Sequence, residues 1–284
     1  MPRILDGLLD ILPDYDVFIV DQWGCMHDGE RAHVGAVPAL EAMRATGKPV
    51  VLVSNSSRPA APSVDILRGL GFADHLYDAM LTAGELARVW LDAERAAGRL
   101  GRAWSVLSAP GPTSVLAQMG FPMADRPGDA DVLVVSGITR EAEEAFDPIL
   151  RAGVERDLPL LCLNPDRVSV QPDGSHCLCP GTFAARYAAM GGRVRSWGKP
   201  GAAIYDAALA HSPGWRRGLA IGDSLEHDVA GGRAAGLDTV LITRGIHWPS
   251  LADAPTARAD PARLQALCRR EGIAPRFALS TLRP

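Results

Sequence analysis

The sequence predicts an α/β protein with a parallel β-sheet as its framework. Short apolar runs rich in β-branched residues alternate along the chain with longer segments whose apolar residues recur at helical spacing. Strands and helices that alternate in this way form a parallel sheet covered by helices, with right-handed crossovers. Polar residues directly follow several of the apolar runs, and in such sheets ligands bind beyond the carboxyl ends of the strands. The same pattern therefore predicts the fold class and the place of a site.

Composition narrows the functional classes. A chain of 284 residues that is 47% hydrophobic and 22% charged has the composition of a globular protein with one large or two ordinary domains. The net charge of −4 provides no basic excess to neutralise phosphates, so we expect no nucleic-acid partner. No apolar run approaches the roughly 20 residues of a membrane span, and the first residues lack the apolar region of a signal peptide. We therefore expect no membrane association and a cytoplasmic location.

The first part of the chain predicts two strand–helix pairs. The apolar, β-branched run 17–20 is too short for a core helix and leads into Asp21. Gly24 follows and is suited to a tight turn or to close approach of the backbone to a ligand. The elements expected here are strands over 17–20 and 49–53 and helices over 37–45 and 62–70.

The middle of the chain predicts a second α/β unit of about a hundred residues, large enough for its own small core. No linker rich in glycine, serine or charge separates it from the first part, so we expect an insertion rather than a separate domain. The expected domains are a core of residues 1–82 and 182–284 and an inserted α/β cap of residues 83–181. The elements expected in this region are helices over 82–97, 112–119 and 140–152 and strands over 104–107, 132–135 and 158–162.

The first pattern resumes after residue 181. The strand expected over 218–222 leads into Asp223, so a second carboxylate should lie at the same sheet edge as Asp21. Residues 273–284 give no prediction. The elements expected in this part are helices over 182–190, 202–210, 228–235 and 261–270 and strands over 218–222 and 239–243.

Polar residues at these strand ends and helix starts form one chemical set. Asp21 and Asp223 can hold a hard cation such as Mg²⁺, which binds through one or two carboxylates and substrate phosphate. Lys199 supplies a positive charge for a phosphoryl group, and Ser54 with the backbone N–H groups around Asn55 can donate to its oxygens. A carboxylate can also attack phosphorus. For Asp21 alone, a turn-capping role is an equally good explanation, but the other segments favour a functional one.

These segments resemble, in order and spacing, the four motifs of the haloacid dehalogenase (HAD) superfamily. The resemblance covers nearly the whole chain and is nearest to subclass IIA, whose large α/β cap is inserted between the second and third motifs, and to the sugar-phosphate and ribonucleotide monophosphatase group. It implies a Rossmann-like core, a cap that shapes the substrate pocket, Mg²⁺ as cofactor and a small phosphorylated metabolite as substrate. A homodimer is a possible assembly. The motifs lie at residues 21–29, 51–56, 198–200 and 221–228.

The resemblance implies a role for each residue around the metal. Asp21 is the expected nucleophile and a Mg²⁺ ligand. The backbone carbonyl of Trp23 and the carboxylate of Asp223 are the other expected ligands. Asp228 is expected in the outer shell, near the waters of the metal or orienting the lysine of the third motif.

The substrate is expected to meet a second group of residues. The resemblance implies that Ser54 and Asn55 bind the phosphoryl group and that Lys199 neutralises it. Asn164 and Asp166 resemble the cap loop that reaches the substrate in this subclass. An ordinary turn initiated by Asn-Pro explains these two residues equally well.

Trp23 departs from the family pattern. Phosphatases of the superfamily carry a second aspartate at this position, which protonates the leaving group and then activates water. An indole N–H does not usefully ionise, and general acid–base help contributes about 10²–10⁴-fold to a rate. Phosphate and metal binding should persist, because only the backbone carbonyl of this residue is required for the metal.

Three explanations of Trp23 stay open. His27 or Asp28 could replace the missing acid, although a hydrogen-bonded polar histidine and an ordinary Asp-Gly turn explain them better. The reaction could instead cleave a carbon–halogen or phosphonate bond, or the protein could bind a phosphorylated metabolite without turning it over. We favour a Mg²⁺-dependent phosphatase that acts through an aspartyl-phosphate on Asp21. The alternative is a catalytically impaired phosphometabolite-binding protein.

Overall fold

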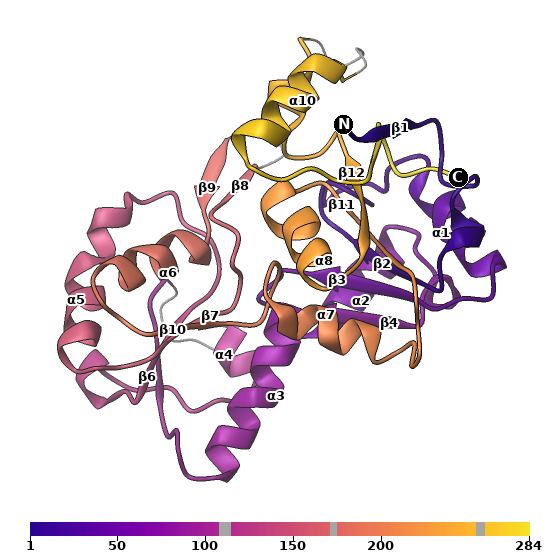
Figure 1. Ribbon diagram of the computed structural model, residues 1–284. Coiled ribbons are helices and arrows are strands. Elements are labelled where there is room, and N and C mark those ends of the chain that lie inside the picture. The colour runs from indigo at the N-terminus through magenta and orange to yellow at the C-terminus, as the bar shows by residue number, and fades with distance from the viewer. Residues whose placement is uncertain (108–114, 171–174, 254–258) are drawn as a thin grey trace. The chain divides into compact units, whose positions relative to one another are not determined.

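The computed structural model describes residues 1–107, 115–170, 175–253 and 259–284 (Figure 1). The chain divides into two compact units, and each unit has a parallel sheet, so the predicted α/β class is confirmed. The core unit comprises Met1–Ser54, Ser63–Leu81 and Lys199–Pro284, and the inserted unit comprises Asn55–Pro62 and Thr82–Gly198.

The core unit is built on a seven-stranded sheet in the order β1-β13-β12-β11-β2-β3-β4. Neighbouring strands from β1 through to β3 run parallel. β2 and β11 lie side by side, although the whole insertion separates them in sequence, and every residue of both is buried (Figure 1). Parallel strands covered on both faces bury such unbroken apolar runs. The strands are β1 (Arg3–Leu5), β2 (Val17–Asp21), β3 (Val50–Ser54), β4 (Ala79–Thr82), β11 (Gly218–Gly222), β12 (Asp238–Ile242) and β13 (Phe277–Leu279).

The helices of the core unit follow local signals in the sequence. The last of them begins with proline at its first position, and Asp260 caps it by accepting a hydrogen bond from the N–H of Ala262 at 2.7 Å. The helices are α1 (Ala36–Ala45), α2 (Ala60–Gly69), which runs across the boundary between the units, α7 (Ala202–Leu209), α8 (Ala230–Ala234), α9 (Trp248–Leu251) and α10 (Pro261–Arg270), with short 3₁₀ helices at Leu12–Asp14 and Asp74–Leu76 and a π-helical turn at Leu225–Val229.

The inserted unit has a four-stranded parallel sheet in the order β10-β7-β6-β5. Each face of this sheet packs against a separate apolar cluster. An antiparallel pair, β8 with β9, adds a small second sheet. The elements are β5 (Ala103–Ser105), β6 (Val132–Val135), β7 (Leu160–Cys162), β8 (Val168–Val170), β9 (His176–Leu178), β10 (Val194–Ser196), α3 (Ala83–Ala96), α4 (Val115–Gln118), α5 (Asp147–Glu155) and α6 (Pro180–Ala189), with 3₁₀ helices at Pro127–Asp129 and Glu143–Phe146.

The insertion is longer than the sequence predicted, because it ends at Gly198 rather than at residue 181. The sequence predicts a helix over 182–190 in the core, yet Phe183 and Tyr187 of α6 belong to an apolar cluster of the inserted unit. The hydroxyl of Tyr187 donates to the backbone carbonyl of Leu158 at 2.6 Å. β10, for which no strand was expected, pairs with β7. Of the helix expected over 112–119, residues 112–114 lie outside the described residues.

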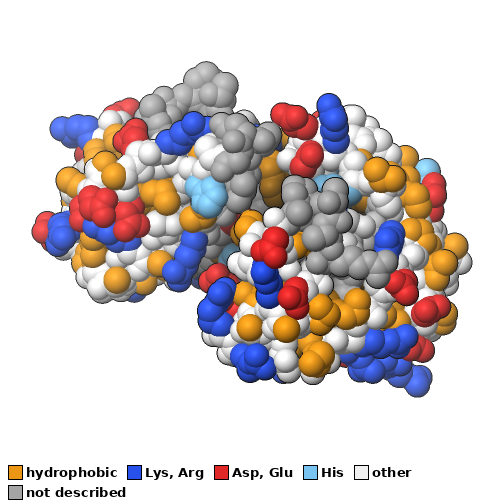
Figure 2. All heavy atoms as spheres, turned by 90° about the horizontal axis from the view of Figure 1, so that it is seen from above, with side chains coloured by type: hydrophobic (Ala, Val, Ile, Leu, Met, Phe, Trp, Pro, Cys, Tyr) orange, Lys and Arg blue, Asp and Glu red, His pale blue; other side chains and the backbone are white. Residues whose placement is uncertain are grey.

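The surface carries both signs of charge, interspersed with apolar side chains on the face shown in Figure 2. This mixture agrees with the small net charge of −4. None of the helices in the described part of the chain combines the length and apolar character that crossing a membrane requires.

Candidate active site

Lys199 lies between two carboxylates of the core unit. Its Nζ is 2.5 Å from Oδ1 of Asp21 and 2.7 Å from Oδ1 of Asp228, and its side chain is only 3% exposed. Asp21 ends β2, Lys199 is the first residue of the core unit after the insertion, and Asp228 lies in the π-helical turn. Three segments that are distant in sequence therefore converge on one ammonium group.

Asp223 completes a cluster of three buried carboxylates. β2 and β11 are parallel neighbours, so Asp21 at the end of β2 and Asp223 directly after β11 lie at the same edge of the sheet. One carboxylate oxygen from each of Asp21, Asp223 and Asp228 lies within 4.8 Å of the others. Oδ2 of Asp223 also accepts a hydrogen bond from the N–H of Ile246 at 2.7 Å.

Two glycines allow the backbone to close around Asp223. Gly24 has a φ of 77°, in the left-handed region that favours glycine, and a Cβ at this position would lie 2.2 Å from Oδ2 of Asp223. A Cβ at Gly245 would lie 2.1 Å from the Cβ of Asp223. A side chain at either position would displace the carboxylate, so the backbone at Gly24 lies close to Asp223, and its approach to a ligand stays a prediction.

Burial and mutual repulsion shift the pKa values of the cluster. Burial raises the pKa of Asp21 to about 7 against the opposing charge of Lys199, and Asp228 adds to this rise. Burial, followed by repulsion from Asp21 and Asp228, also raises the pKa of Asp223 well above its usual value. Burial would lower the pKa of Lys199, but Asp21 and Asp228 outweigh it and raise that pKa, so the ammonium group stays charged.

The donor set of this cluster fits a hard divalent cation. Three buried carboxylates face one buried ammonium group, so negative charge is in excess when all of them are ionised. A buried charge without a partner is unfavourable, and the raised pKa values of Asp21 and Asp223 express this cost. Carboxylate oxygens are the ligands that Mg²⁺ and Ca²⁺ take, whereas softer metals favour thiolate or imidazole.

The loop after β2 is organised by the backbone carbonyl of Gln22. This oxygen accepts hydrogen bonds from the N–H groups of Cys25, Met26 and His27 at 3.2, 2.7 and 3.3 Å. Cys25, Met26 and His27 are buried, whereas the side chain of Trp23 is 49% exposed. The loop is therefore tightly fixed, and Trp23 lies on its outer side.

The indole of Trp23 packs on its own loop. It lies edge-on to the ring of His27, with ring centroids 5.8 Å apart and an angle of 78° between the planes. Gly29 has a φ of 97°, and a Cβ there would lie 2.3 Å from Cη2 of Trp23. The side chain at the position expected for a general acid thus serves as a cover for residues 27–29.

Neither residue considered as a substitute acid is protonated near neutral pH. Burial lowers the pKa of His27 to about 4, and its Nδ1 accepts a hydrogen bond from the N–H of Gly29 at 3.0 Å, as only the neutral ring can. Oδ1 of the exposed Asp28 accepts hydrogen bonds from the N–H groups of Arg31 at 2.8 Å and Glu30 at 2.9 Å, and these bonds lower its pKa. These contacts agree with the structural explanations, a hydrogen-bonded polar histidine for His27 and an ordinary turn for Asp28.

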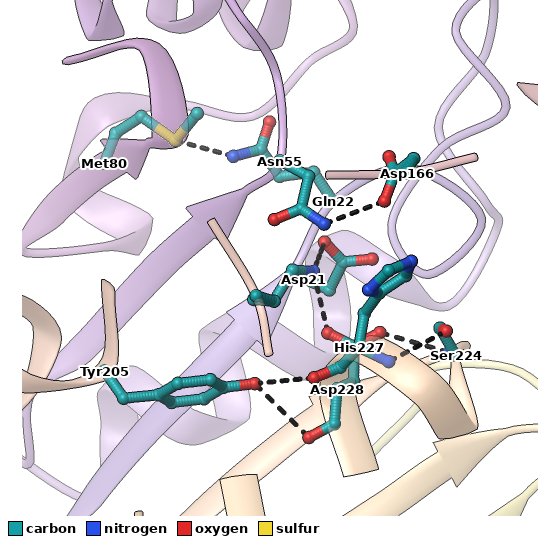
Figure 3. A network of polar contacts seen from close by, with 10 residues as sticks. Asp21, Gln22, Asn55, Met80, Asp166, Tyr205, Ser224, His227 and Asp228 are labelled. Atoms are coloured by element: carbon teal, nitrogen blue, oxygen red, sulfur yellow. Dashed lines mark hydrogen bonds and ion pairs between the residues drawn. The ribbon is translucent and has the colours of Figure 1, made fainter. Parts of the chain in front are cut away.

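Asn55, Asn164 and Asp166 form a hydrogen-bonded group in the inserted unit. Nδ2 of the buried Asn55 donates to Oδ1 of Asp166 at 2.7 Å (Figure 3). Oδ1 of Asn164 accepts from the N–H of Asp166 at 2.9 Å, so the expected Asn-Pro turn is present. This turn directs Asp166 to Asn55, and the role of the segment in substrate binding stays a prediction. Ser54 ends β3 in the core unit and is half-buried.

Sequence reasoning missed residues that fix the π-helical turn. The hydroxyl of Tyr205 on α7 lies 3.3 Å from the backbone carbonyls of both His227 and Asp228 and can donate to either (Figure 3). Oγ of Ser224 accepts from the N–H of His227 at 3.1 Å. Nε2 of His247 accepts from the first N–H of the turn at 3.0 Å. Ser224 carried a capping signal just before a helix start, whereas Tyr205 and His247 act through tertiary contacts that no local pattern reports.

Two family models match the sequence, and curated relatives extend the likeness over most of the chain. The model of haloacid dehalogenase-like hydrolases matches residues 18–122, and a second, HAD-hydrolase-like model matches residues 196–265. Chronophin of Homo sapiens is 31% identical over 254 residues, which cover 84% of this chain and 85% of chronophin. The D-glycerol 3-phosphate phosphatase of Mycobacterium tuberculosis is 27% identical over 261 residues, covering 87% and 69% of the two chains. The sugar-phosphatase AraL of Bacillus subtilis is 27% identical over 234 residues, covering 80% and 82%.

Solved structures share the fold. A haloacid dehalogenase-like hydrolase from Brucella suis matches with a TM-score of 0.76 and 27% identity, covering 99% of this chain and 100% of that chain. A glycerol phosphate phosphatase from Mycobacterium tuberculosis in complex with magnesium matches with a TM-score of 0.62 and 23% identity, covering 88% and 74%. At 23% identity, the second match shows only that the two proteins share a fold.

Proposed function

The chain belongs to the haloacid dehalogenase-like hydrolases and is a phosphatase of that family, and on this premise we propose that it hydrolyses small phosphorylated metabolites through an aspartyl-phosphate on Asp21. The observation that carries the proposal is the contact of Lys199 with Asp21 beside two further buried carboxylates. Burying a lysine against a carboxylate carries a large desolvation cost, so packing alone does not explain this contact at the sheet edge. The names of the relatives, a D-glycerol 3-phosphate phosphatase and a sugar phosphatase, support hydrolysis of small phosphate esters in general and do not decide the leaving group.

In the proposed reaction, a carboxylate oxygen of Asp21 attacks phosphorus and the bond from phosphorus to the leaving oxygen breaks. Water then attacks the phosphorus of the aspartyl-phosphate, which regenerates the carboxylate and releases inorganic phosphate. Lys199 neutralises the phosphoryl oxygens, and Asp228 orients Lys199 through their 2.7 Å contact. Asp21, Asp223 and the backbone carbonyl of Trp23 would hold Mg²⁺, which supplies positive charge to the phosphoryl group when bound.

A second group of residues is assigned to the substrate by the resemblance to the family. We propose that Ser54 and Asn55 donate to the phosphoryl oxygens, and that Asn164 and Asp166 contact the rest of the substrate. The hydrogen bond between Asn55 and Asp166 supports this assignment, because it ties the proposed phosphate-binding residue to the proposed specificity loop. The cytoplasmic location and the possible homodimer stay predictions.

Trp23 restricts the proposed substrates to phosphate esters with good leaving groups. A departing alkoxide must be protonated, whereas a phenolate, an enolate or another stable anion leaves without help. Trp23 offers no ionisable proton, and near neutral pH His27 is neutral while the pKa of Asp28 is lowered. We therefore expect aryl phosphates to be hydrolysed much faster than alkyl phosphates.

Hydrolysis of matched aryl and alkyl phosphates tests this proposal. The parent, Trp23→Asp and Trp23→Ala would be assayed with Mg²⁺ on p-nitrophenyl phosphate and on a simple alkyl phosphate. Trp23→Asp should raise hydrolysis of the alkyl ester by about 10²–10⁴-fold and that of the aryl ester much less, because it restores a general acid. Trp23→Ala opens the same space without an acid and should leave the alkyl ester a poor substrate. Equal hydrolysis of both esters by the parent would contradict the restriction.

A second candidate function, a catalytically impaired phosphometabolite-binding protein, is favoured by Trp23 itself. In this case the carboxylates and Lys199 would bind a phosphorylated metabolite and Mg²⁺ without turnover. The same assay separates the two functions. A parent that hydrolyses neither ester, together with a Trp23→Asp variant that hydrolyses both, would support binding alone. Activity in the parent that disappears in Asp21→Asn would support the enzyme.

A further inference from the structure

The π-helical turn Leu225–Val229 carries Asp228, the carboxylate that contacts Lys199, so its geometry sets the position of both groups. The carboxylate of Asp228 is held at both oxygens. Oδ1 accepts from Nζ of Lys199 at 2.7 Å, and Oδ2 accepts from the N–H of Ser224 at 3.1 Å. Turns of this kind are rare and occur frequently at functional sites. A residue that fixes the backbone at the start of this turn therefore acts on Asp228, and through it on Lys199.

The first N–H of this turn has its acceptor outside the turn. In general, the first N–H groups of a helical segment have no acceptor within that segment. Oγ of Ser224 accepts from the N–H of His227, so this capping group serves a later N–H. The N–H of Leu225 donates instead to Nε2 of His247, 22 positions further along the chain, at 3.0 Å. Burial lowers the pKa of His247, so its ring is neutral near neutral pH and keeps one nitrogen as an acceptor.

The segment that carries His247 also holds Asp223. The N–H of Ile246 donates to Oδ2 of Asp223 at 2.7 Å, and a Cβ at Gly245 would lie 2.1 Å from the Cβ of Asp223. These residues follow β12, which is the parallel neighbour of β11. One loop therefore contacts Asp223 through its backbone and the turn of Asp228 through a side chain. A change of the His247 side chain removes the second contact and leaves the first.

We propose that His247 is a positioning residue of the phosphatase, because its Nε2 fixes the start of the π-helical turn and thereby directs Asp228 to Lys199. This inference rests on the proposed function, in which Lys199 neutralises the phosphoryl oxygens. His247 acts through the turn and not on the substrate, so its loss should lower the rate of phosphoryl transfer and change the binding of the ester little. Misplacement by about 1 Å of a group that aligns the reaction can lower a rate by about 10²-fold.

Three variants separate the acceptor from the bulk of the side chain. His247→Leu removes the acceptor, His247→Gln offers a carbonyl oxygen in its place, and His211→Leu makes the first change at an exposed position beyond α7. With p-nitrophenyl phosphate and saturating Mg²⁺, kcat of His247→Leu should fall by about tenfold or more, and KM should change by less than about twofold. His247→Gln should regain most of the lost rate, and His211→Leu should match the parent. Equal losses in the two His247 variants, or a change in KM alone, would overturn the proposal.

A double-mutant cycle tests the route through Asp228. In an Asp228→Asn background, His247→Leu should change kcat by less than about twofold, because the group that His247 positions is already altered. Additive losses would show that His247 acts by another route and would overturn the proposal.

Amide exchange of Leu225, followed by NMR, tests the contact without turnover. This amide should be protected in the parent and in His247→Gln and should exchange faster in His247→Leu, while urea midpoints verify that the variants fold. A fast-exchanging amide in the parent would overturn the proposal whatever the activities are. A parent that hydrolyses no phosphate ester would instead contradict the proposed function, and the exchange of Leu225 would then decide whether His247 fixes the turn.

Discussion

At the scale of single residues, the balance of buried charge determines the pKa values of the site. Asp21, Asp223 and Asp228 share one ammonium group, that of Lys199, and burial raises the pKa values of Asp21 and Asp223. A cation in the cluster would remove this penalty and would favour the ionised carboxylate that a nucleophile requires. Metal binding at these residues should therefore be coupled to the stability of the folded protein.

Mg²⁺ should stabilise the folded protein through Asp223. Because the cluster is assembled only in the folded chain, a metal present at 100 times its dissociation constant should add about 2.7 kcal/mol to the free energy of unfolding. Asp223→Asn should abolish most of this gain, and chelation should reverse it in the parent. Urea unfolding with and without Mg²⁺ measures the effect. Asp28→Asn removes an exposed carboxylate outside the cluster and is the matched control, which should respond like the parent.

His27 should make the protein less stable in mild acid. Its pKa is about 4 in the folded chain because of burial, against 6.5 for the ordinary side chain, so below pH 6.5 the unfolded chain binds a proton that the folded chain rejects. The free energy of unfolding should therefore fall by about 3 kcal/mol between pH 6.5 and pH 4 from this residue alone. The free energy of unfolding of His27→Gln should fall less steeply over that window. Equal slopes for parent and variant would show that His27 is not buried in its neutral form.

At the scale of elements, strand ends and short turns place the chemistry. β2 and β11 bring Asp21 and Asp223 to one edge, and the π-helical turn after β11 brings Asp228 to Lys199. Ser224 caps this turn and Tyr205 holds its carbonyl groups, so the position of Asp228 depends on α7 as well as on its own segment. Mutation of Tyr205 would thus act on the site without touching a substrate.

α6 should stabilise the inserted unit and not the core unit. Phe183 is fully buried among residues of the inserted sheet, and truncation of such a side chain costs about 3–5 kcal/mol. In Phe183→Ala, hydrogen exchange should quicken in peptides of β6 and β7 and stay slow in peptides of β11 and β12. Phe18→Ala in β2 is the matched control and should have the reverse effect. Loss of protection in β11 with Phe183→Ala would assign α6 to the core unit after all.

At the scale of the whole molecule, the sequence predicts the long buried strands and helices but not the three-residue strands that form by pairing with distant partners. The strand Gly218–Gly222 and the helix Pro261–Arg270 have the bounds that the sequence predicts. Residues 273–284 gave no prediction, yet Phe277–Leu279 form β13 between β1 and β12. Three-residue strands show no periodicity, and their pairing is decided by distant partners.

For the candidate site too, the sequence predicts some features and not others. The order of the motifs predicts that Asp21, Lys199, Asp223 and Asp228 lie together, and the structure brings these four residues into one cluster. The sequence could not reveal that the turn of Asn164 directs Asp166 to Asn55. It also could not reveal that the indole of Trp23 packs on Gly29, because that contact depends on the left-handed backbone of the glycine.

The central claim is that Asp21 becomes phosphorylated, and trapping of that intermediate tests it most directly. The missing general acid should also slow the attack of water on the aspartyl-phosphate, so the intermediate should accumulate. The parent would be mixed with p-nitrophenyl phosphate and Mg²⁺ and quenched with borohydride, which reduces a phosphorylated aspartate to homoserine, and the peptide that contains residue 21 would be analysed by mass spectrometry. We predict homoserine at position 21 in the parent and an unmodified peptide from Asp21→Asn. Continued hydrolysis with an unmodified Asp21, or homoserine at another aspartate, would contradict the account.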